Sequence, residues 1–253
     1  MNSGIIDILN GISSATKELN IKELPTQGVF YPVDFTINIR KASFDDIMLY
    51  NFNYIKDDLG VILKETKRII RKNIILGDKY KYEDLKSNDL LYIFFEIVKF
   101  TMNRDITVSH VDIFGNIVQI PFCSANFNYF NYDSLKCEYN EVTREFIKDG
   151  YRFSLPSVGV ENCLVEYICG LDERGEDTDV NYDFLFFLGN KNYLSYDEMD
   201  NLVTIFNEDL DDMEKEKISN IIKLIYPAIG YTLKWNNKIV SLDMKIDFEK
   251  LFI

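Results

Sequence analysis

One stretch of the sequence decides how the fold begins: Leu24-Pro25-Thr26-Gln27-Gly28-Val29-Phe30-Tyr31-Pro32, followed by the alternating run Phe35-Thr36-Ile37-Asn38-Ile39-Arg40. Each proline fixes its own φ angle, and Gly28 permits a positive φ that other residues resist. The alternation of apolar and polar residues after Pro32 has the period of a β-strand. Together they predict a stiff turn that leads into a strand.

The composition limits the class of protein. The chain has 253 residues, 47% of them apolar, which is enough to bury a core in one large or two small domains. Its 28 basic and 41 acidic residues give a formal charge of −13, which repels nucleic-acid phosphates and anionic membranes. No apolar run approaches the roughly 18 residues of a membrane span, and Met1-Asn2-Ser3-Gly4 lacks the basic region of a secretory signal. We therefore expect no nucleic-acid partner and no membrane.

Apolar residues at helical spacing predict helices in the first half. Residues 4–20 have an amphipathic pattern ahead of the turn. Ser43 and Asp46 predict a capping box at the start of the next helix, and another helix begins near Asp57. The helix that follows Asn88-Asp89 is apolar over more than half of its circumference, so we expect it at the centre of the N-terminal core.

A change of period after this helix predicts a β-hairpin. Residues 106–111 and 117–122 alternate, and Gly115 supplies the turn between them. His110 lies in this hairpin. Because no cysteine or carboxylate stands at ligand spacing from it, we interpret His110 as structural.

The second half repeats the mixture of helices and strands after Gly150 and Pro156. An acidic loop is expected at 172–183, and Ser195 is a candidate helix cap. The expected regular elements are a strand at 151–155, helices at 160–171, from 195 onward and at 211–226, and a hairpin formed by 231–235 and 239–244.

The opening motif also carries a family resemblance. The pattern Leu-Pro-x-x-Gly-x-Phe-Tyr-Pro at 24–32, the strand ending in Arg40 and the helix opening Ser43-Phe44-Asp45-Asp46 resemble the N-terminal signature of baseplate hub and hub-assembly proteins of T-even-like contractile-tailed phages. The resemblance covers about residues 22–135. It implies a structural or chaperone-like assembly role, exerted through protein contacts, and implies no catalysis.

The resemblance also has a point of departure. Related sequences commonly place a Cys-x-x-Cys pair in the hairpin region, whereas this chain has Phe114-Gly115-Asn116-Ile117 there and Cys123 alone after it. If relatives hold a metal with those cysteines, this chain has lost the site and has a glycine turn instead.

The residues offer little for catalysis or for metal binding. Cys123, Cys137, Cys163 and Cys169 lack metal-ribbon spacing, and we interpret them as reduced, buried or half-buried side chains. Residues 177–183 alternate like a calcium loop, but Tyr182 replaces its glycine and Leu188 its final glutamate. No phosphate-binding or serine-hydrolase motif occurs. We expect no catalytic, cofactor-binding or metal-binding residues, no cofactor and no enzymatic activity.

Two segments allow a structural and a binding interpretation. The helix expected at 4–20 packs either on its own domain or, as an arm, on a neighbouring subunit. The basic side chains on the helix after Asp57 form either a solvated face or a surface for an acidic protein partner; they are Lys64, Lys67, Arg68, Arg71 and Lys72.

The expected architecture is α+β, with an N-terminal helical lobe that includes a β-hairpin and a second mixed lobe that ends in a β-hairpin. We expect an arm helix at 1–23, a hub-assembly-like domain at 24–150 and a C-terminal lobe at 151–253. Apolar residues outside any evident core predict the partner contacts. These residues are Leu24, Phe30, Tyr31, Phe248 and Phe252.

The expected function is that of a structural or assembly component of a contractile-tail baseplate hub. Its partners would be hub, tube or tape-measure proteins, in a multi-copy symmetric assembly. It would act in the host cytoplasm during assembly, and in the tail baseplate of the virion if it is retained. Two alternatives from other classes stay open: a carboxylate-dependent hydrolase of cell-wall glycan and a general protein-binding module.

Overall fold

The structure is a computed structural model that describes residues 15–43, 45–46, 59–112, 114–123, 127–225, 232–235 and 238–241. The fold is mixed α+β, as the sequence predicts. The helices are α3 (Leu59–Asn73), α4 (Leu90–Met102), α5 (Tyr132–Leu135), α6 (Val158–Glu173), α7 (Tyr196–Thr204) and α8 (Asp212–Ile225). The strands are β1 (Thr16–Leu19), β2 (Ile37–Arg40), β3 (Ile74–Leu76), β4 (Thr107–Val111), β5 (Ile117–Pro121), β6 (Glu138–Asn140), β7 (Glu145–Lys148), β8 (Tyr151–Phe153), β9 (Thr232–Trp235) and β10 (Lys238–Ser241).

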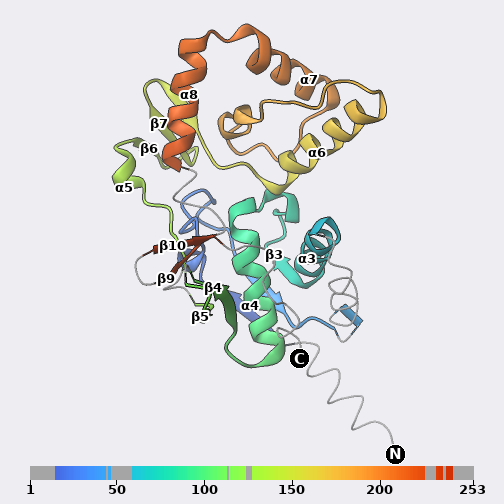
Figure 1. Cartoon of the computed structure of the whole chain (residues 1–253), viewed down its shortest axis with the longest axis vertical. Coiled ribbons are helices and arrows are strands. Elements are labelled where there is room, and N and C mark those ends of the chain that lie inside the picture. The colour runs from blue at the N-terminus through green and yellow to red at the C-terminus, as the bar shows by residue number, and fades with distance from the viewer. Residues whose placement is uncertain are drawn as a thin grey trace, which may run out of the picture.

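Figure 1 shows two lobes, one around α3 and α4 and the other around α6, α7 and α8. In the first lobe, an antiparallel sheet of order β1-β2-β3 packs against α4. Ile37 and Ile39 point to the core from β2 and are fully buried. Helix α4 is buried along most of its length, because its apolar residues face both the sheet and α3. This confirms that the helix after Asn88-Asp89 is the centre of the first core.

The helix expected at 4–20 is wrong at its C-terminal end. Thr16–Leu19 forms strand β1, whose Leu19 pairs with Ile37 of β2. Leu19 fits the helical spacing, but the sheet buries it instead, because pairing with β2 outweighs the local preference. The arm helix proposed for residues 1–23 therefore does not extend through 16–23, and residues 1–14 lie outside the described part of the chain.

Local capping signals in the first lobe are confirmed. The Ser43 amide donates to the Asp46 carboxylate, and the Asp46 amide donates to the Ser43 hydroxyl, both at 3.2 Å. These are the two bonds of a capping box. The helix α4 ends at Asn103, whose φ of 51° is left-handed, as at many helix C-termini.

Both predicted hairpins are present. In the first, β4 pairs with β5 so that His110 lies opposite Val118. Gly115 has a φ of +83° in the turn, and the Asp112 carboxylate accepts from the Phe114 and Asn116 amides. In the second hairpin, β9 pairs with β10.

The second lobe combines a small sheet with three longer helices. The sheet has the order β6-β7-β8. Ser157 caps α6 by accepting from the Val160 amide, and Ser195 forms a capping box with Glu198 at the start of α7. A π-helical turn, Ile205–Asp209, separates α7 from α8. The helix starts predicted at Ser195 and near Asp211 are confirmed.

The predicted domain boundary at 150–156 does not divide the structure. Strands β7 and β8 pair across Gly150, with Phe146 opposite Phe153. One apolar cluster combines Phe130 and Phe146 with Leu155 and with Ile218 of α8. The second lobe therefore consists of residues 130–225. The changes of period that suggested the boundary occur within this lobe, because its sheet precedes its helices.

The acidic loop after α6 is expected to be the first site of proteolysis. All residues from Asp172, in the last turn of α6, to Asp179 in the loop are exposed, whereas Ile93, Phe94 and Phe95 within α4 are fully buried. Proteases need an accessible, locally unfolded backbone. Brief treatment with a glutamate- or aspartate-specific protease, followed by mass spectrometry, should give first cuts within 172–179. First cuts inside α4 would contradict this assignment.

The exposure of the cysteines agrees with expectation at three of the four positions. All four cysteines are free; Cys123, Cys137 and Cys163 are half-buried, but Cys169 is exposed, contrary to the expectation for it. Helical spacing on α6 turns Cys169 away from the core that Leu164 and Leu171 enter.

Among the described helices, none has the length and apolar character of a membrane span.

Candidate functional site

The opening motif lies at the junction of the two lobes. The Pro25 carbonyl accepts from the Phe130 amide at 2.8 Å, and the Val29 carbonyl accepts from the Tyr139 hydroxyl at 2.5 Å. Phe30 inserts into the second lobe, with its ring centroid 4.9 Å from that of Phe130. The stiff turn predicted from the sequence thus exists, and its role is to join the lobes.

Gly28 is required at its position in this turn. Its φ is +73°, and a Cβ there would lie 3.1 Å from a side-chain carbon of Ile21. Both the backbone conformation and the space therefore favour glycine.

The expectation that the motif contacts a partner directly is wrong for its apolar side chains. Leu24, Phe30 and Tyr31 are 0, 1 and 2% exposed, so they are core residues of this chain. Their burial comes from residues that are distant in sequence, which the local pattern does not reveal. The other two predicted contact residues, Phe248 and Phe252, lie outside the described residues.

Phe30→Ala is therefore expected to destabilise the monomer. Removing a fully buried phenylalanine ring typically costs about 3–5 kcal/mol. Urea denaturation should show this loss, whereas the same truncation at Phe114, which is 81% exposed, should change stability by less than about 0.5 kcal/mol. Equal effects of the two substitutions would contradict the assignment of Phe30 to the core.

A buried carboxylate organises the junction. Asp89, which is 0% exposed, precedes α4. It accepts from the Thr26 amide at 3.0 Å, from the Thr26 hydroxyl at 2.7 Å and from the Tyr31 hydroxyl at 2.7 Å. Tyr31 in turn accepts from the Lys86 amide at 2.9 Å. The motif is thus fastened to the start of α4 by polar bonds inside the protein.

Lys86 continues this network into the second lobe. Its side chain is buried, with the residue 2% exposed, and Nζ donates to the Leu155 carbonyl at 2.8 Å. A single antiparallel bridge also pairs Lys86 with Ser157, and the Val158 amide donates to the Leu85 carbonyl. The segment Leu85–Lys86 is therefore a second connection between the lobes.

Burial shifts the pKa values of both charged groups. Desolvation raises the pKa of Asp89 to about 6, although the hydrogen bonds from Tyr31 and Thr26 favour the carboxylate. Desolvation lowers the pKa of Lys86 to about 8, against the attraction of Asp89 and Asp84. Near neutral pH the junction thus contains a carboxylate and an ammonium group, and both have lost their hydration.

The pH dependence of stability should reveal Asp89. Because its pKa rises from 3.8 to about 6 on folding, the folded protein binds more protons than the unfolded chain in this window. The contribution of Asp89 to stability therefore falls as the pH rises from about 4 to 6. We expect the free energy of unfolding of the wild type, relative to that of Asp89→Asn, to decrease across this window and then level off.

This comparison also removes the opposing effect of Asp46. Burial alone would raise the pKa of Asp46, but hydrogen bonds from Ser43, Arg68 and Lys72 outweigh it and hold this pKa below the usual range. Asp46 therefore loses stabilising interactions as the pH falls, equally in both proteins. Denaturation curves at intervals of half a pH unit provide the measurement. A difference that is constant from pH 4 to 6, or that favours the wild type as the pH rises, would contradict the raised pKa.

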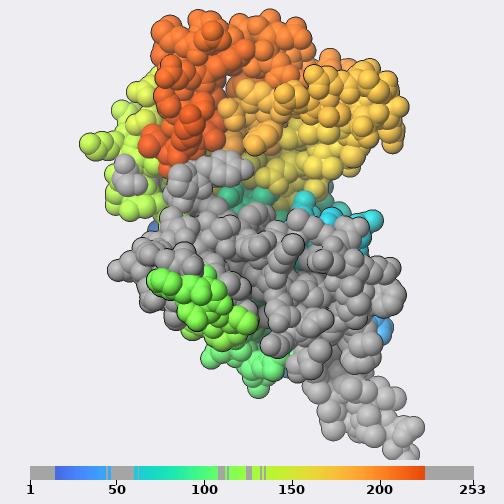
Figure 2. All heavy atoms as spheres, in the orientation of Figure 1, coloured from blue at the N-terminus to red at the C-terminus, as the bar shows by residue number. Residues whose placement is uncertain are grey.

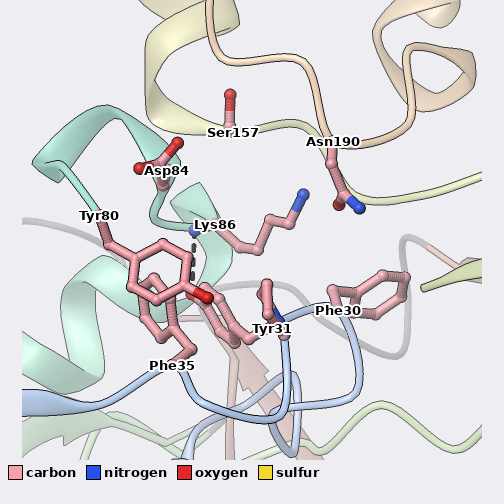
Figure 3. A pocket seen from close by; sticks show the side chains of 9 residues that line it. Phe30, Tyr31, Phe35, Tyr80, Asp84, Lys86, Ser157 and Asn190 are labelled. Atoms are coloured by element: carbon pink, nitrogen blue, oxygen red, sulfur yellow. Dashed lines mark hydrogen bonds between the residues drawn. The ribbon is translucent and has the colours of Figure 1, made fainter. Parts of the chain in front are cut away.

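A pocket lies between the lobes beside this network. It encloses about 160 Å³ and is lined by Phe30, Tyr31, Pro32, Phe35, Tyr80, Asp84, Lys86, Ser157 and Asn190. Figure 3 shows the aromatic rings of the first lobe on one side, Ser157 and Asn190 of the second lobe on the other, and Lys86 extending between them. Tyr31 and Phe35 stack with centroids 4.4 Å apart, and the Tyr80 ring is tilted against Phe35 at 4.7 Å.

The sequence did not single out this constellation. The sequence pattern marks Asp89 only as a helix-start residue, and no motif marks Lys86, Tyr80, Asp84, Ser157 or Asn190. One available signal was Lys86-Ser87-Asn88-Asp89, a polar run that leads directly into a very apolar helix. When such an apolar helix is buried, the polar run at its start is buried with it. The charged groups of the run then need hydrogen-bond or charge partners inside the protein.

The basic residues on α3 bond to acidic groups of the same chain. The Arg68 guanidinium contacts the Asp46 and Glu65 carboxylates at 2.8 and 2.7 Å, and Lys72 contacts Asp46 at 3.0 Å. Arg71 contacts Glu83 at 2.8 Å. Much of the positive charge that an acidic partner would need is thus already compensated.

The residues of the rejected calcium pattern have local roles. The Asp177 carboxylate accepts from the Asp179 amide, and the Asn181 side chain accepts from the Asp183 amide. In the part of the chain that the structure describes, no group of three or more His, Cys, Asp and Glu side chains is placed to hold a metal ion.

Comparison of the chain with models of protein families, with curated proteins and with solved structures finds no match.

Proposed function

We propose that this protein is a structural or assembly component of the baseplate hub of a contractile phage tail, and that it acts through protein–protein contacts. The observation that carries the proposal is the motif at residues 24–32, which resembles the opening signature of hub and hub-assembly proteins.

The geometry of the motif supports this proposal. At the lobe junction, Gly28 forms the turn, Phe30 packs in the second core, and the Tyr31 hydroxyl donates to the Asp89 carboxylate. A sequence pattern that specifies a junction between two lobes is typical of one fold. A pattern that specifies only a turn before an edge strand would recur in unrelated proteins. The role of the motif is to set the two lobes in a fixed arrangement for assembly.

The partner surface is assigned to the tip of the β4–β5 hairpin, because the apolar residues of the motif are buried. Phe114 and Ile117 are 81 and 70% exposed at this tip. Figure 2 shows the hairpin, in bright green, at the surface of the molecule. Neighbouring exposed apolar side chains at a hairpin turn favour a contact site, since aromatic anchors contribute strongly to interfaces.

The distribution of charge favours a defined orientation in a complex. Residues 130–225 contain 22 acidic and 9 basic side chains, so the formal charge of −13 of the whole chain falls within this segment. The rest of the chain is balanced, with 19 of each sign. Complementary charge on a partner would steer the second lobe toward it, whereas apolar contacts would supply most of the affinity.

Co-purification with tail proteins tests the proposal. The wild-type protein, co-expressed with hub, tube and tape-measure proteins of a contractile tail, should co-purify with at least one of them. Phe114→Asp should lower the recovery at least tenfold without changing the melting temperature. Val142→Asp, at an equally exposed apolar position in the β6–β7 turn, is the matched control and should have no effect.

Failure to bind any tail protein would overturn the proposal. Equal losses for Phe114→Asp and Val142→Asp would instead overturn the assignment of the surface to the hairpin. Release of sugar from cell-wall glycan by the purified protein would favour the hydrolase alternative.

A further inference from the structure

We propose that the pocket between the lobes binds a carboxylate that carries one small apolar group, with Lys86 Nζ as the hydrogen-bond donor to that carboxylate. This site is independent of the hairpin surface and of the proposed hub role.

The size and lining of the pocket indicate a small ligand with an apolar part. Protein interiors are close-packed, and voids much larger than a water molecule are few. A cavity of about 160 Å³ is comparable to the engineered apolar cavity of about 150 Å³ in another protein that binds benzene. Phe30, Tyr31 and Phe35 form a buried aromatic floor, and the exposed Asn190 stands at the margin, which gives a ligand an entry.

Most polar groups around the pocket are already occupied by the protein. The Ser157 hydroxyl donates to the Lys191 carbonyl, and the Asn190 amide nitrogen donates to the Thr143 carbonyl. The Tyr80 hydroxyl donates to Asp34. The Tyr31 hydroxyl donates to Asp89.

Asp84 is occupied as well. Its two carboxylate oxygens accept from the Asn192 side chain and from the Lys81 amide.

Lys86 is the exception among the buried residues that line the pocket. An ammonium group has three hydrogens to donate, and one hydrogen bond, to the Leu155 carbonyl, is formed. Asp89 and Asp84 act on it through space, but no carboxylate of the described residues makes a contact ion pair with it. A buried ammonium without a contact anion is costly. An anionic acceptor in the pocket would remove that cost.

The pocket therefore combines the two elements that a small carboxylic acid needs. Its carboxylate would accept from Lys86 Nζ, and its apolar group would lie against the rings of Phe30 and Phe35. Two sources have this chemistry: a free aromatic acid, and the C-terminal residue of another protein chain, whose end carries both a carboxylate and a side chain.

Titration of the full-length protein with benzoate tests the site. Calorimetry should detect binding of benzoate, and benzyl alcohol, which has a similar size but no charge, should bind at least tenfold more weakly. Lys86→Met should abolish benzoate binding, and circular dichroism checks its fold before the titration, because removing one charge of a buried network can destabilise a protein. The exposed Lys81 provides the matched control, and Lys81→Met should bind as the wild type does.

A second measurement does not depend on the stability of the variant. In wild-type protein with nitrogen-15-labelled lysine, saturating benzoate should raise the pKa of the Lys86 ammonium, because a contact anion favours its charged form. Absence of benzoate binding at 10 mM, equal binding by Lys86→Met, or an unchanged Lys86 pKa at saturation would each overturn the proposal.

N-acetylphenylalanine and its amide separate the two sources. If the acid binds at least tenfold more tightly than benzoate and the amide does not bind, the site takes a chain end. If benzoate binds more tightly than N-acetylphenylalanine, the site takes a free acid. Either result supports a carboxylate site, and tight binding of the amide would overturn it. A negative co-purification with tail proteins would leave these outcomes unchanged, so the two proposals fail separately.

Discussion

Replacing Asp89 by alanine is expected to lower the free energy of unfolding by about 3–5 kcal/mol, the range observed when one partner of a buried charged network is removed. The substitution leaves the Thr26 amide, the Thr26 hydroxyl and the Tyr31 hydroxyl without their common acceptor. It also removes a carboxylate that offsets the buried charge of Lys86. Urea denaturation monitored by circular dichroism measures the loss.

Two variants make this result specific. Asp89→Asn keeps the size and one oxygen acceptor, so its loss should be smaller than that of the alanine variant. Asp105→Ala removes a carboxylate whose side chain is 87% exposed and which pairs with Lys99; an exposed pair of this kind contributes about 0–1 kcal/mol. If Asp89→Ala costs no more than Asp105→Ala, the polar network does not hold the lobes together.

Gly159→Ala is expected to lower the free energy of unfolding by at least as much as Asp89→Ala, for a steric reason. A Cβ at this position, in the first turn of α6, would lie 1.8 Å from the Asn192 carbonyl oxygen. Since that oxygen belongs to the backbone, relief requires α6 and the loop around Asn192 to separate. Overpacking typically costs about 1–3 kcal/mol, and a backbone clash this close should exceed the upper value.

Gly170→Ala is the matched control on the same helix. A Cβ there would meet its nearest atom, on the Arg174 side chain, at an ordinary 3.5 Å. Alanine is favoured over glycine in a helix by about 0.5–1 kcal/mol, so this variant should be slightly more stable than the wild type. Thermal melting of both variants decides the point, and a stable Gly159→Ala would show that α6 and the Asn192 loop are not in close contact.

The sequence predicts elements of this fold where the signal is local. The hairpin at Gly115, the box formed by Ser195 and Glu198 and the apolar helix α4 each follow from a period or a cap within a few residues. Strand β1 was missed because its four residues are a strand only through pairing with β2, whose partner residues lie 18 or more positions away.

The candidate site was missed for the same physical reason. Tyr31, Lys86 and Asp89 meet because the motif folds back onto the start of α4, and Leu155 and Ser157 join them from the second lobe. No spacing rule connects positions 58 or 69 residues apart. The sequence did identify the motif as important, but it assigned its aromatic residues to a partner, because the core that buries Phe30 is built from residues 130–225.

The insertion of Phe30 into the second lobe has a consequence for folding during synthesis. Domains generally fold as units while the chain emerges from the ribosome, at about 5–20 residues per second. The core that receives Phe30 includes Ile225 of α8, so this ring waits on the order of 10–40 s for its site to be completed. During that interval an early segment presents an aromatic side chain that a chaperone can hold. Helix α8, the last helix among the described residues, therefore completes the packing of the first motif, and we expect truncation before α8 to leave the nascent chain prone to aggregation.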